Sequence, residues 1–546
     1  MNVFAEQVCP RPSANNANSW ALQKKLMPQD GTMDDEFSFA VALSSDGNTA
    51  LVGAPYADIG ANEDQGAAYV FTRSGTTWSQ QKKLVVPDGN SNTWFGYAVA
   101  LSSNGNTVLV GAMGADTNQG AAYVFTRYGA TWSQPTKLVA DDGAAYDYMG
   151  HGVALSSNGY TALVGASFAD VGGRADQGAA YVFTGSGGSW NQQKKLIAAD
   201  GALSDVFGHA VALSSDGNTA LVSAYQSGIA NLGAGYVFKR SGSAWSQQAK
   251  LTAADGATGN QLGWAVALSG NGNTALLGTP WGIVGRTMSG AGYVFTRSGA
   301  TWSQQAKLAA ADGREWDDFG YTVALSGDGN TALIGAPDAD VGGHADQGAG
   351  YLFARSGSAW SQQEKVAAAD GATYDYFGCA VALSADAQTV LVGAYYPNTG
   401  YDQKYGAAYL FTDGGSSPVG PTIKANGSTN NVSVNYPDLL SVTVEMNAGS
   451  YAGTPVDWWI IAYAHSGQWY YLNHAQQWTL FNGNLAFCRP VYQGALFNLP
   501  STTVLDRYQP PRGTYDFWFA VDYPMDGTLE LTPGCHLYKM VTVTVQ

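Results

Sequence analysis

Residues 95–112 read FGYAVALSSNGNTVLVGA, and this stretch decides the fold. Two runs rich in Val, Leu and Ala flank the turn at residues 103–106 (SNGN), a pattern typical of a β-hairpin. Residues 120–127 (GAAYVFTR) and 131–138 (TWSQPTKL) follow with the same strand character and are joined by a Tyr-Gly-Ala turn. The unit therefore predicts four short antiparallel strands.

This unit is repeated along the chain. A Trp that opens a Ser- and Gln-rich run recurs every 54–58 residues, at Trp20, Trp78, Trp132, Trp190, Trp245, Trp302 and Trp360. An apolar residue followed by a small one recurs in step with it, at Phe37-Ser38, Phe95-Gly96, Met149-Gly150, Phe207-Gly208, Leu262-Gly263, Phe319-Gly320 and Phe377-Gly378. Four strands repeated seven times predict an all-β fold, a seven-bladed β-propeller over residues 20–413.

The phase of the repeats predicts how the ring closes. The seventh copy supplies three strands, the last at residues 406–412, whereas residues 20–26 (WALQKKL) are a fourth strand with no first three before it. We expect residues 20–26 to complete blade seven, which removes an open sheet edge. Residues 1–19 are then an N-terminal arm.

The chain after the repeats is a different module. Residues 414–421 (GGSSPVGP) have the composition of a linker, and alternating apolar runs in residues 422–546 predict a compact β-sandwich domain. Trp458, Trp459 and Trp469 concentrate aromatic surface there. They are candidate platforms for stacking on a sugar, and the alternative is that they fill the core of the sandwich.

The repeats resemble a known family. Phe95-Gly96 with the run Leu109–Ala112, and the run Leu51–Pro55 (LVGAP), resemble FG-GAP repeats, the units of the integrin α-subunit propeller and of many secreted bacterial proteins. The C-terminal Asp-Trp-Trp at 457–459 and the Gly-x-Tyr-x-Phe run at 513–517 resemble β modules on secreted bacterial proteins. The resemblance implies a propeller used mainly for binding and an extracellular setting. The family's calcium loop needs several acids between the first two strands, and one acid in Ser-x-Asp-Gly-Asn-Thr at 44–49 does not supply them.

Charge and hydropathy exclude several kinds of partner. Asp and Glu number 42 against 26 Lys and Arg, a net charge of −16, which argues against nucleic acid and anionic membranes. The apolar runs are short and end in Gly, Pro or Asp, so no membrane span is expected. No charged start leads into an apolar core near Met1, which predicts that a secretory signal is absent or already removed.

One series of positions varies among otherwise matching repeats. The residue after each apolar-small pair is Phe39, Tyr97, His151, His209, Trp264, Tyr321 or Cys379, whereas the Val two positions later is constant. If the first strand of each blade is innermost, these side chains form a ring near the mouth of the central channel, on the face that carries the long loops. Two interpretations stay open: the ring fills the tapering channel, or it is an aromatic binding site, for a sugar among other ligands.

A second series contains paired carboxylates. Blades one, three and six carry two Asp residues six positions apart in a Gly-rich loop before the third strand, namely Asp58 with Asp64, Asp170 with Asp176, and Asp340 with Asp346. Such a loop can wrap a calcium ion with carboxylate and carbonyl oxygens. Asp and Gly are equally ordinary turn residues. An Asp-Gly step shared by all seven blades, at Asp30, Asp88, Asp142, Asp200, Asp255, Asp312 and Asp370, is expected to be a structural turn.

The four cysteines favour an oxidising compartment. Cys488 and Cys535 both fall in the C-terminal module and are expected to pair. Cys9 lies in the arm before the strand expected to close blade seven, and Cys379 opens the first strand of that blade, so a bond between them or two free thiols are the alternatives. The sequence shows no nucleophile elbow, zinc-protease motif or phosphate loop. We therefore predict a non-enzymatic binding or adhesion protein, extracellular or on the cell surface, whose ligand is a glycan or a surface protein. The rival prediction is a structural subunit of an extracellular sheath, filament or surface layer.

Overall fold

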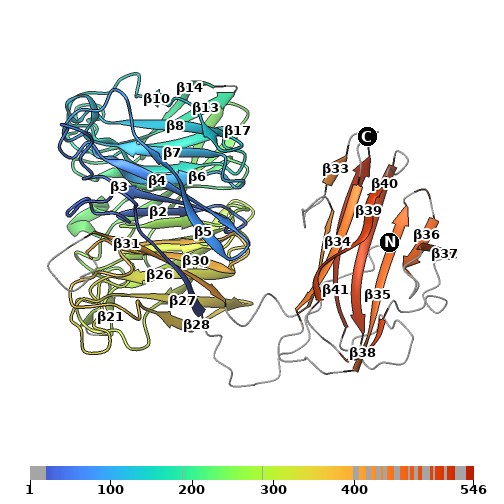
Figure 1. Ribbon diagram of the computed structural model, residues 1–546. Helices are drawn as coiled ribbons and strands as arrows, with labels where there is room; N and C mark the ends of the chain where they lie inside the picture. Colours follow the sequence, from blue (N-terminus) through green and yellow to red (C-terminus); the bar gives the residue numbers. More distant parts are fainter. Residues whose placement is uncertain are drawn as a thin grey trace. The chain divides into compact units, whose positions relative to one another are not determined.

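The chain divides into two compact units, of which Ser19–Asp413 forms one and residues from Gly414 onward belong to the other. The structure is a computed structural model (Figure 1). It describes residues 20–186, 188–285, 287–396 and 405–413 of the first unit. In the second unit it describes Ser466 and the strands named below. Nearly all regular structure is β, as predicted.

The first unit contains seven antiparallel blade sheets, of which six have four strands and that of blade two has five, because its fourth strand is split. In blades one to six the strands follow one another in sequence order from the inside outward. The strands of blades one to three are β2 (Ala40–Leu43), β3 (Thr49–Ala54), β4 (Ala67–Ser74), β5 (Thr77–Leu84); β6 (Phe95–Leu101), β7 (Thr107–Ala112), β8 (Ala121–Tyr128), β9 (Thr131–Trp132) with β10 (Thr136–Leu138); and β11 (Met149–Leu155), β12 (Thr161–Ala166), β13 (Ala179–Ser186), β14 (Ser189–Leu196). Those of blades four to six are β15 (Phe207–Leu213), β16 (Thr219–Ala224), β17 (Ala234–Ser241), β18 (Ala244–Leu251); β19 (Val266–Leu268), β20 (Thr274–Thr279), β23 (Ala291–Ser298), β24 (Thr301–Leu308); and β25 (Thr322–Leu325), β26 (Thr331–Ala336), β27 (Ala349–Ser356), β28 (Ala359–Val366). This confirms the predicted seven-bladed β-propeller.

Blade seven is assembled from both ends of the unit. Its strands are β29 (Ala380–Leu383), β30 (Thr389–Ala394), β31 (Ala407–Asp413) and β1 (Trp20–Leu26). The β1 strand pairs antiparallel with β31, with Trp20 opposite Asp413 and Leu26 opposite Ala408. An edge that would otherwise be open is thereby hydrogen-bonded within the molecule.

Blade two departs from the expected pattern in its fourth strand. Residues 131–138 were predicted as one strand, but the prediction is wrong there, because the strand is split into β9 and β10 around Pro135. Proline has no N–H to donate to the sheet, so the ladder is interrupted at that residue. The remaining regular elements are short loop features: the turns α1 (Ala115–Asn118) and η1 (Ser227–Asn231), and the hairpin β21 (Ile283–Val284) with β22 (Thr287–Met288).

The core lies between neighbouring blades and explains the apolar-small pair. Phe95 is fully buried, and within its own blade its ring meets those of Tyr123 and Phe125 edge to face at 5.8 Å and 6.0 Å. It belongs to one buried cluster with Leu51 and Val70 of blade one. The small residues allow the backbones to approach: a Cβ on Gly111 of β7 would lie 2.0 Å from the carbonyl oxygen of Gly150 in the next blade. Bulk at one position and the lack of a side chain at another thus fix the spacing between blades.

The turns between the first and second strands form a closed circle of backbone hydrogen bonds at one end of the channel. Each turn donates a backbone N–H to a carbonyl of the next turn, around the circle Ser45, Ser103, Ser157, Ser215, Gly270, Gly327, Ala385 and back to Ser45. The first strands are therefore innermost, as the sequence predicted. The long loops before the first and third strands lie at the opposite end.

The Asp-Gly series has a role beyond that of a turn. Each Asp carboxylate forms an ion pair with a Lys on the fourth strand of the following blade, with Nζ–Oδ2 distances of 2.7–2.8 Å. The pairs are Asp30–Lys83, Asp88–Lys137, Asp142–Lys195, Asp200–Lys250, Asp255–Lys307, Asp312–Lys365 and Asp370–Lys25. Each Lys ammonium also lies over a Tyr ring, at 5.0–5.6 Å from its centroid. Because the carboxylates are about half exposed, one pair stabilises little, about 1 kcal/mol or less. The set joins every blade to the next.

The described residues of the second unit form two sheets. A three-stranded sheet contains β32 (Gly420–Ala425), β34 (Leu440–Asn447) and β39 (Leu499–Tyr508). A seven-stranded sheet contains β33 (Val432–Val434), β41 (His536–Val545), β40 (Gly513–Asp522), β35 (Pro455–Ala464), β36 (Gln468–Leu472), β37 (Trp478–Phe481) and β38 (Tyr492–Ala495). All pairings are antiparallel except that of β33 with β41.

Candidate aromatic site at the channel mouth

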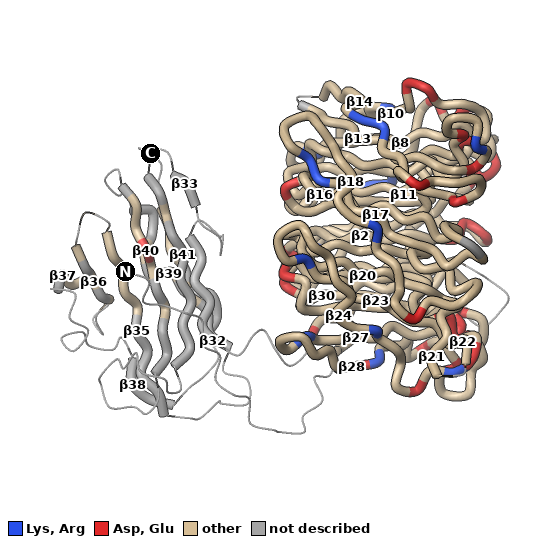
Figure 2. Tube along the Cα trace, turned by 180° about the vertical axis from the view of Figure 1, so that it is seen from behind, with Lys and Arg blue, Asp and Glu red and all other residues tan. Residues whose placement is uncertain are grey.

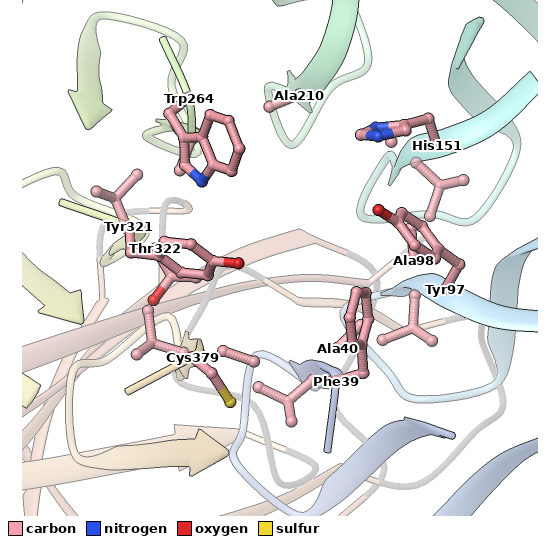
Figure 3. A pocket seen from close by; sticks show the side chains of 18 of the residues that line it. Phe39, Ala40, Tyr97, Ala98, His151, Ala210, Trp264, Tyr321, Thr322 and Cys379 are labelled. Atoms are coloured by element: carbon pink, nitrogen blue, oxygen red, sulfur yellow. The ribbon is translucent and has the colours of Figure 1, made fainter. Parts of the chain in front are cut away.

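The seven variable residues meet around one cavity. Phe39, Tyr97, His151, His209, Trp264, Tyr321 and Cys379, called here the inner ring, line a cavity of about 290 Å³ together with Tyr395 and the constant Val positions. Figure 3 shows side chains of this ring projecting from successive blades around a central space. The predicted ring therefore exists as a geometric unit.

Six members of the inner ring form a continuous arc of rings. Each ring contacts the next one in the series Phe39, Tyr97, His151, His209, Trp264, Tyr321. The distances between the centroids of consecutive rings are 4.8, 5.2, 4.5, 4.9 and 5.8 Å. Cys379 supplies no ring, and Tyr395 of blade seven reaches Phe39 instead, at 6.4 Å. The arc thus has one small side chain in it, at blade seven.

The two histidines act as neutral aromatic rings. His151 Nδ1 hydrogen-bonds to the backbone carbonyl of His209 at 3.0 Å, so this nitrogen carries the proton. Burial lowers the pKa of His151, and burial followed by the neighbouring His151 lowers the pKa of His209 well below its usual value. Burial likewise raises the pKa of the Cys379 thiol, which stays protonated. The cavity is therefore lined by uncharged groups.

A second ring of residues was missed by the sequence reasoning. The residue just before each apolar-small pair has a positive φ of 50–57°, at Glu36, Trp94, Tyr148, Val206, Gln261, Asp318 and Tyr376, called here the outer ring. A left-handed backbone at such side chains costs roughly 1–2 kcal/mol each. The variability of this position beside an otherwise constant pair could have identified the ring from the sequence. Because the series mixes acidic, aromatic and aliphatic residues, it does not indicate one kind of chemistry.

Tyr376 of the outer ring and several neighbouring aromatic residues extend the aromatic surface. The Tyr376 ring is stacked on Tyr395 at 5.5 Å with an interplanar angle of 9°, and it lies 6.4 Å from Tyr374. On the other side of the mouth, Trp281 and Tyr225 contact Trp264 at 5.0 and 5.1 Å. The aromatic surface at the mouth thus includes more residues than the seven that were predicted.

Blade six carries a pair of carboxyl groups at this mouth. Asp318 of the outer ring and Asp338, which follows β26, are hydrogen-bonded to each other. Burial and then the charge of Asp338 raise the pKa of Asp318 to about 7, and burial and then the charge of Asp346 raise that of Asp338 to about 6. Asp317 adds to the same repulsion. The pair therefore shares a proton near neutral pH.

This pair predicts a pH-dependent stability. Carboxyls whose pKa is raised on folding favour the folded state at low pH, and this advantage is lost as the pH rises from about 4 to about 7. Replacing Asp338 with Asn (Asp338→Asn) removes the repulsion, so we expect it to raise the free energy of unfolding by about 1 kcal/mol at pH 8 and by little at pH 5. Urea unfolding at both values measures it.

Asp328→Asn is the matched control in the same blade. Although burial opposes ionisation there, hydrogen bonds from Ser326 and Asn330 hold the pKa of Asp328 below its usual value. Its replacement should therefore lower stability at pH 8. Equal effects of the two substitutions at pH 5 and pH 8 would contradict the assignment.

The long-loop face is acidic. Figure 2 shows Asp and Glu predominating along the face that carries β21 and β22, whereas Lys and Arg mix with acids along the opposite face. On the opposite face, Arg73, Arg297 and Arg355 are each tied to the Asn of a first hairpin, as in Arg73 Nε to Asn48 Oδ1 at 2.7 Å. The field at the mouth therefore disfavours anionic ligands.

The predicted calcium loops are held by their own hydrogen bonds. In blade one the backbone N–H of Asp64 donates to Asp58 Oδ1 at 2.9 Å, and blades three and six repeat this with Asp176 to Asp170 and Asp346 to Asp340. Asp340 also pairs with Arg314 at 3.2 Å. In the described part of the chain, no three His, Cys, Asp or Glu side chains form a metal-binding group. Each loop offers two carboxylates, so most of the six to eight oxygens that calcium prefers would come from carbonyls and water.

Some of the predicted sites are not visible. Cys9, Cys488 and Cys535 lie outside the described residues, as do the side chains of Trp458, Trp459 and Trp469 on β35 and β36. The predicted Cys488–Cys535 disulfide and the C-terminal aromatic site therefore stay predictions, and the choice between a Cys9–Cys379 bond and free thiols stays open. Cys379 itself is buried at the inner ring and has no disulfide partner among the described residues.

Fold and ring together define a class of protein, a closed β-propeller with a varied mouth on a repeated scaffold. The FG-GAP repeat matches this chain seven times, over residues 20–71, 78–125, 132–183, 190–238, 245–295, 302–353 and 360–411. The chain belongs to the FG-GAP repeat family. Each match starts at the Trp of a fourth strand and ends in the third strand of the next blade, so the repeat is shifted by one strand from the blade.

Individual relatives are more distant. Mouse (Mus musculus) integrin alpha-2 is 32% identical over 130 residues, which cover 22% of this chain and 11% of the integrin, so the chain spans about a tenth of that relative. A structure of Kuenenia stuttgartiensis hydrazine synthase has a TM-score of 0.44 at 13% identity, covering 67% of this chain and 95% of that one. The RRP9 WD40 repeats give 0.42 at 9% identity, covering 71% and 96%. None of the helices among the described residues has the length and apolarity to cross a membrane.

Proposed function

We propose that this is a non-enzymatic extracellular or cell-surface binding protein that holds a glycan at the mouth of its propeller. The observation that carries the proposal is the inner ring, in which the most variable position at the start of the first strand places six contiguous rings around one cavity. Constant positions build the scaffold, and the varied ones gather where a rigid frame presents them. Membership of a family that includes an integrin propeller is compatible with binding or adhesion.

The cavity suits a small, uncharged, ring-shaped group. About 290 Å³ lies at the lower end of ligand-pocket volumes, roughly 300–1,000 Å³. Its walls are aromatic, and Tyr97, Tyr321 and Tyr395 add hydroxyl groups. Flat apolar rings with a few hydroxyls match the faces and edges of a sugar, and the acidic field around them disfavours an anionic side chain of a protein partner.

The proposal is tested by screening the purified full-length chain on a glycan array and on an array of extracellular-matrix proteins. We expect binding to glycans, with no requirement for turnover. Binding to proteins alone would replace the glycan with a protein partner. No binding on either array, together with ordered polymers in negative-stain images, would overturn the proposal in favour of the structural-subunit alternative.

Calcium in blades one, three and six remains part of this proposal. Repulsion supports it, because burial and then the nearby Asp58 raise the pKa of Asp64, and burial and then Asp340 raise that of Asp346. A bound divalent cation would relieve that repulsion. EDTA is therefore expected to lower the melting temperature by a few degrees, and added calcium should restore it. A melting temperature that EDTA does not change would show that no calcium is bound. The Asp58→Asn variant should lose the part of the EDTA effect that comes from blade one.

A further inference from the structure

The boundary between blades six and seven differs from the equivalent boundaries in a way that points to a ligand. Tyr376, from the loop that enters blade seven, lies near enough to Asp338 of the blade-six carboxyl pair to be affected by its charge, and the ring of Tyr374 lies 6.4 Å from that of Tyr376. The backbone N–H groups of Tyr374 and Tyr376 bond to the carbonyls of Ala345 and Asp346, which fixes this loop against blade six. Aromatic rings and carboxyl groups are therefore held together by backbone contacts.

The boundary between blades two and three provides a direct comparison. Tyr146 and Tyr148 occupy the same two loop positions there, with φ of 72° and 53° against 68° and 55° for Tyr374 and Tyr376. The places of Asp318 and Asp338 are taken by Trp94 and Gly114, and the Trp94 ring lies so close that a Cβ on Gly114 would be 3.0 Å from it. One boundary is thus filled with an indole, and the other carries two hydrogen-bonding groups.

Tyr374 is displayed toward solvent at a cost. Its side chain is 55% exposed, and its backbone adopts a conformation that Asn92 (φ 62°) and Gly259 (φ 77°) adopt at the same place in blades two and five. Asn and Gly accept this region more readily than Tyr does. Tyr146 in blade three and Trp316 in blade six are equally exposed at this position with φ of 72° and 71°, so what distinguishes Tyr374 is the carboxyl pair at the same boundary.

The displayed ring is continuous with the cavity. From Tyr374 the ring contacts run through Tyr376 at 6.4 Å and Tyr395 at 5.5 Å to Phe39 of the inner ring at 6.4 Å. The groups that act on the carboxyl pair are Asp317 and Asp346, with Arg314 near Asp317. These contacts form a continuous path of rings from the cavity to this boundary.

We propose that the boundary of blades six and seven is a second carbohydrate subsite, where a neutral sugar unit stacks on Tyr374 and Tyr376 and hydrogen-bonds through its hydroxyls to Asp318 and Asp338. This rests on the proposed glycan-binding function and specifies its ligand as a neutral chain that extends from the cavity to the rim. Two carboxyls that share a proton offer both a donor and acceptors, which suits a vicinal diol. The acidic surroundings exclude a uronic acid or sulfated chain.

The test is isothermal titration of the full chain with cellohexaose, chitohexaose, mannohexaose and, as the anionic counterpart, hexagalacturonate. We expect at least one neutral hexaose to bind and hexagalacturonate not to bind. Tyr374→Asn and Asp338→Ala should each weaken the neutral ligand about tenfold. Tyr146→Asn, the same change at the same loop position in blade three, should alter affinity less than twofold.

The outcomes separate this subsite from the function on which it rests. If Trp264→Ala abolishes binding while Tyr374→Asn and Asp338→Ala leave it unchanged, the subsite is wrong and the channel site stands. If no hexaose binds, or only hexagalacturonate does, the neutral-glycan subsite is wrong, and the array results decide the function. Tyr374→Asn is expected to melt at or above the wild-type temperature, because Asn suits its backbone. A fall in melting temperature that accounts for the lost binding would make Tyr374 structural and overturn the proposal.

Discussion

Deletion of residues 1–26 is expected to abolish the cooperative unfolding of the propeller as a closed ring. The deletion removes β1, and with it the ladder to β31, the buried side chain of Leu26 and the ion pair of Lys25 with Asp370. It also removes Gln23, whose Oε1 accepts the indole N–H of Trp78 in blade one at 3.1 Å. The lost burial and hydrogen bonds amount to on the order of 5 kcal/mol, and β31 becomes an exposed edge.

Calorimetry and size-exclusion chromatography measure this effect. We expect a melting temperature lower by ten degrees or more and a shift to soluble aggregates. The control deletion of residues 1–18 leaves β1 complete and likewise lacks Cys9, so the difference in melting temperature between the two deletions isolates the contribution of β1. Equal stability of the two deletions would show that β1 contributes nothing to closing the ring.

Trp264→Ala is expected to lower the affinity for the ligand at the mouth by about 30-fold or more. Trp264 has the most ring contacts in the arc, with His209, Tyr225, Trp281 and Tyr321 all within 5.8 Å of its centroid. Removing such a central aromatic anchor typically costs about 2 kcal/mol of binding free energy or more. Titration of the array ligand against wild type and variant gives the value.

Two further variants make the Trp264 result interpretable. Trp264→Phe keeps a flat ring and should retain most of the affinity. Tyr128→Ala removes a side chain that is 80% exposed on the opposite, short-turn face, and it should leave the affinity unchanged. Equal loss in Trp264→Ala and Tyr128→Ala would place the ligand elsewhere.

The repeated features of this chain could be predicted from its sequence because each blade restates them. The hairpin turns and the Phe-Gly spacing recur in register in every blade, so seven weak local signals support one fold. The seventh copy lacks a fourth strand, and residues 20–26 are a fourth strand without a blade of their own. Pro135 interrupts a strand that was expected to be whole. The missing N–H of this one residue occurs in a single blade, so comparison of the repeats did not predict its effect.

Contacts between blades could not be read in this way. The ion pair of Asp30 with Lys83 joins residues 53 positions apart, and both look unremarkable in a turn and on a strand. Asp318 and Asp338 meet because one loop enters blade six and the other leaves its second strand, while Trp94 and Gly114 stand in the same places in blade two. The inner ring was accessible because its members share one position in the repeat; the carboxyl pair belongs to one blade alone.

The central claim is that ligand binds at the long-loop mouth, and hydroxyl-radical footprinting with mass spectrometry tests it most directly. The full chain is oxidised with and without the array ligand at saturation, and modification of individual Trp and Tyr side chains is compared. We predict protection of Trp264, Trp281 and Tyr374, with no change at Tyr128 or at Tyr160, which is 57% exposed on the short-turn face. Protection of Tyr128 and Tyr160 with Trp264, Trp281 and Tyr374 unchanged would contradict the account.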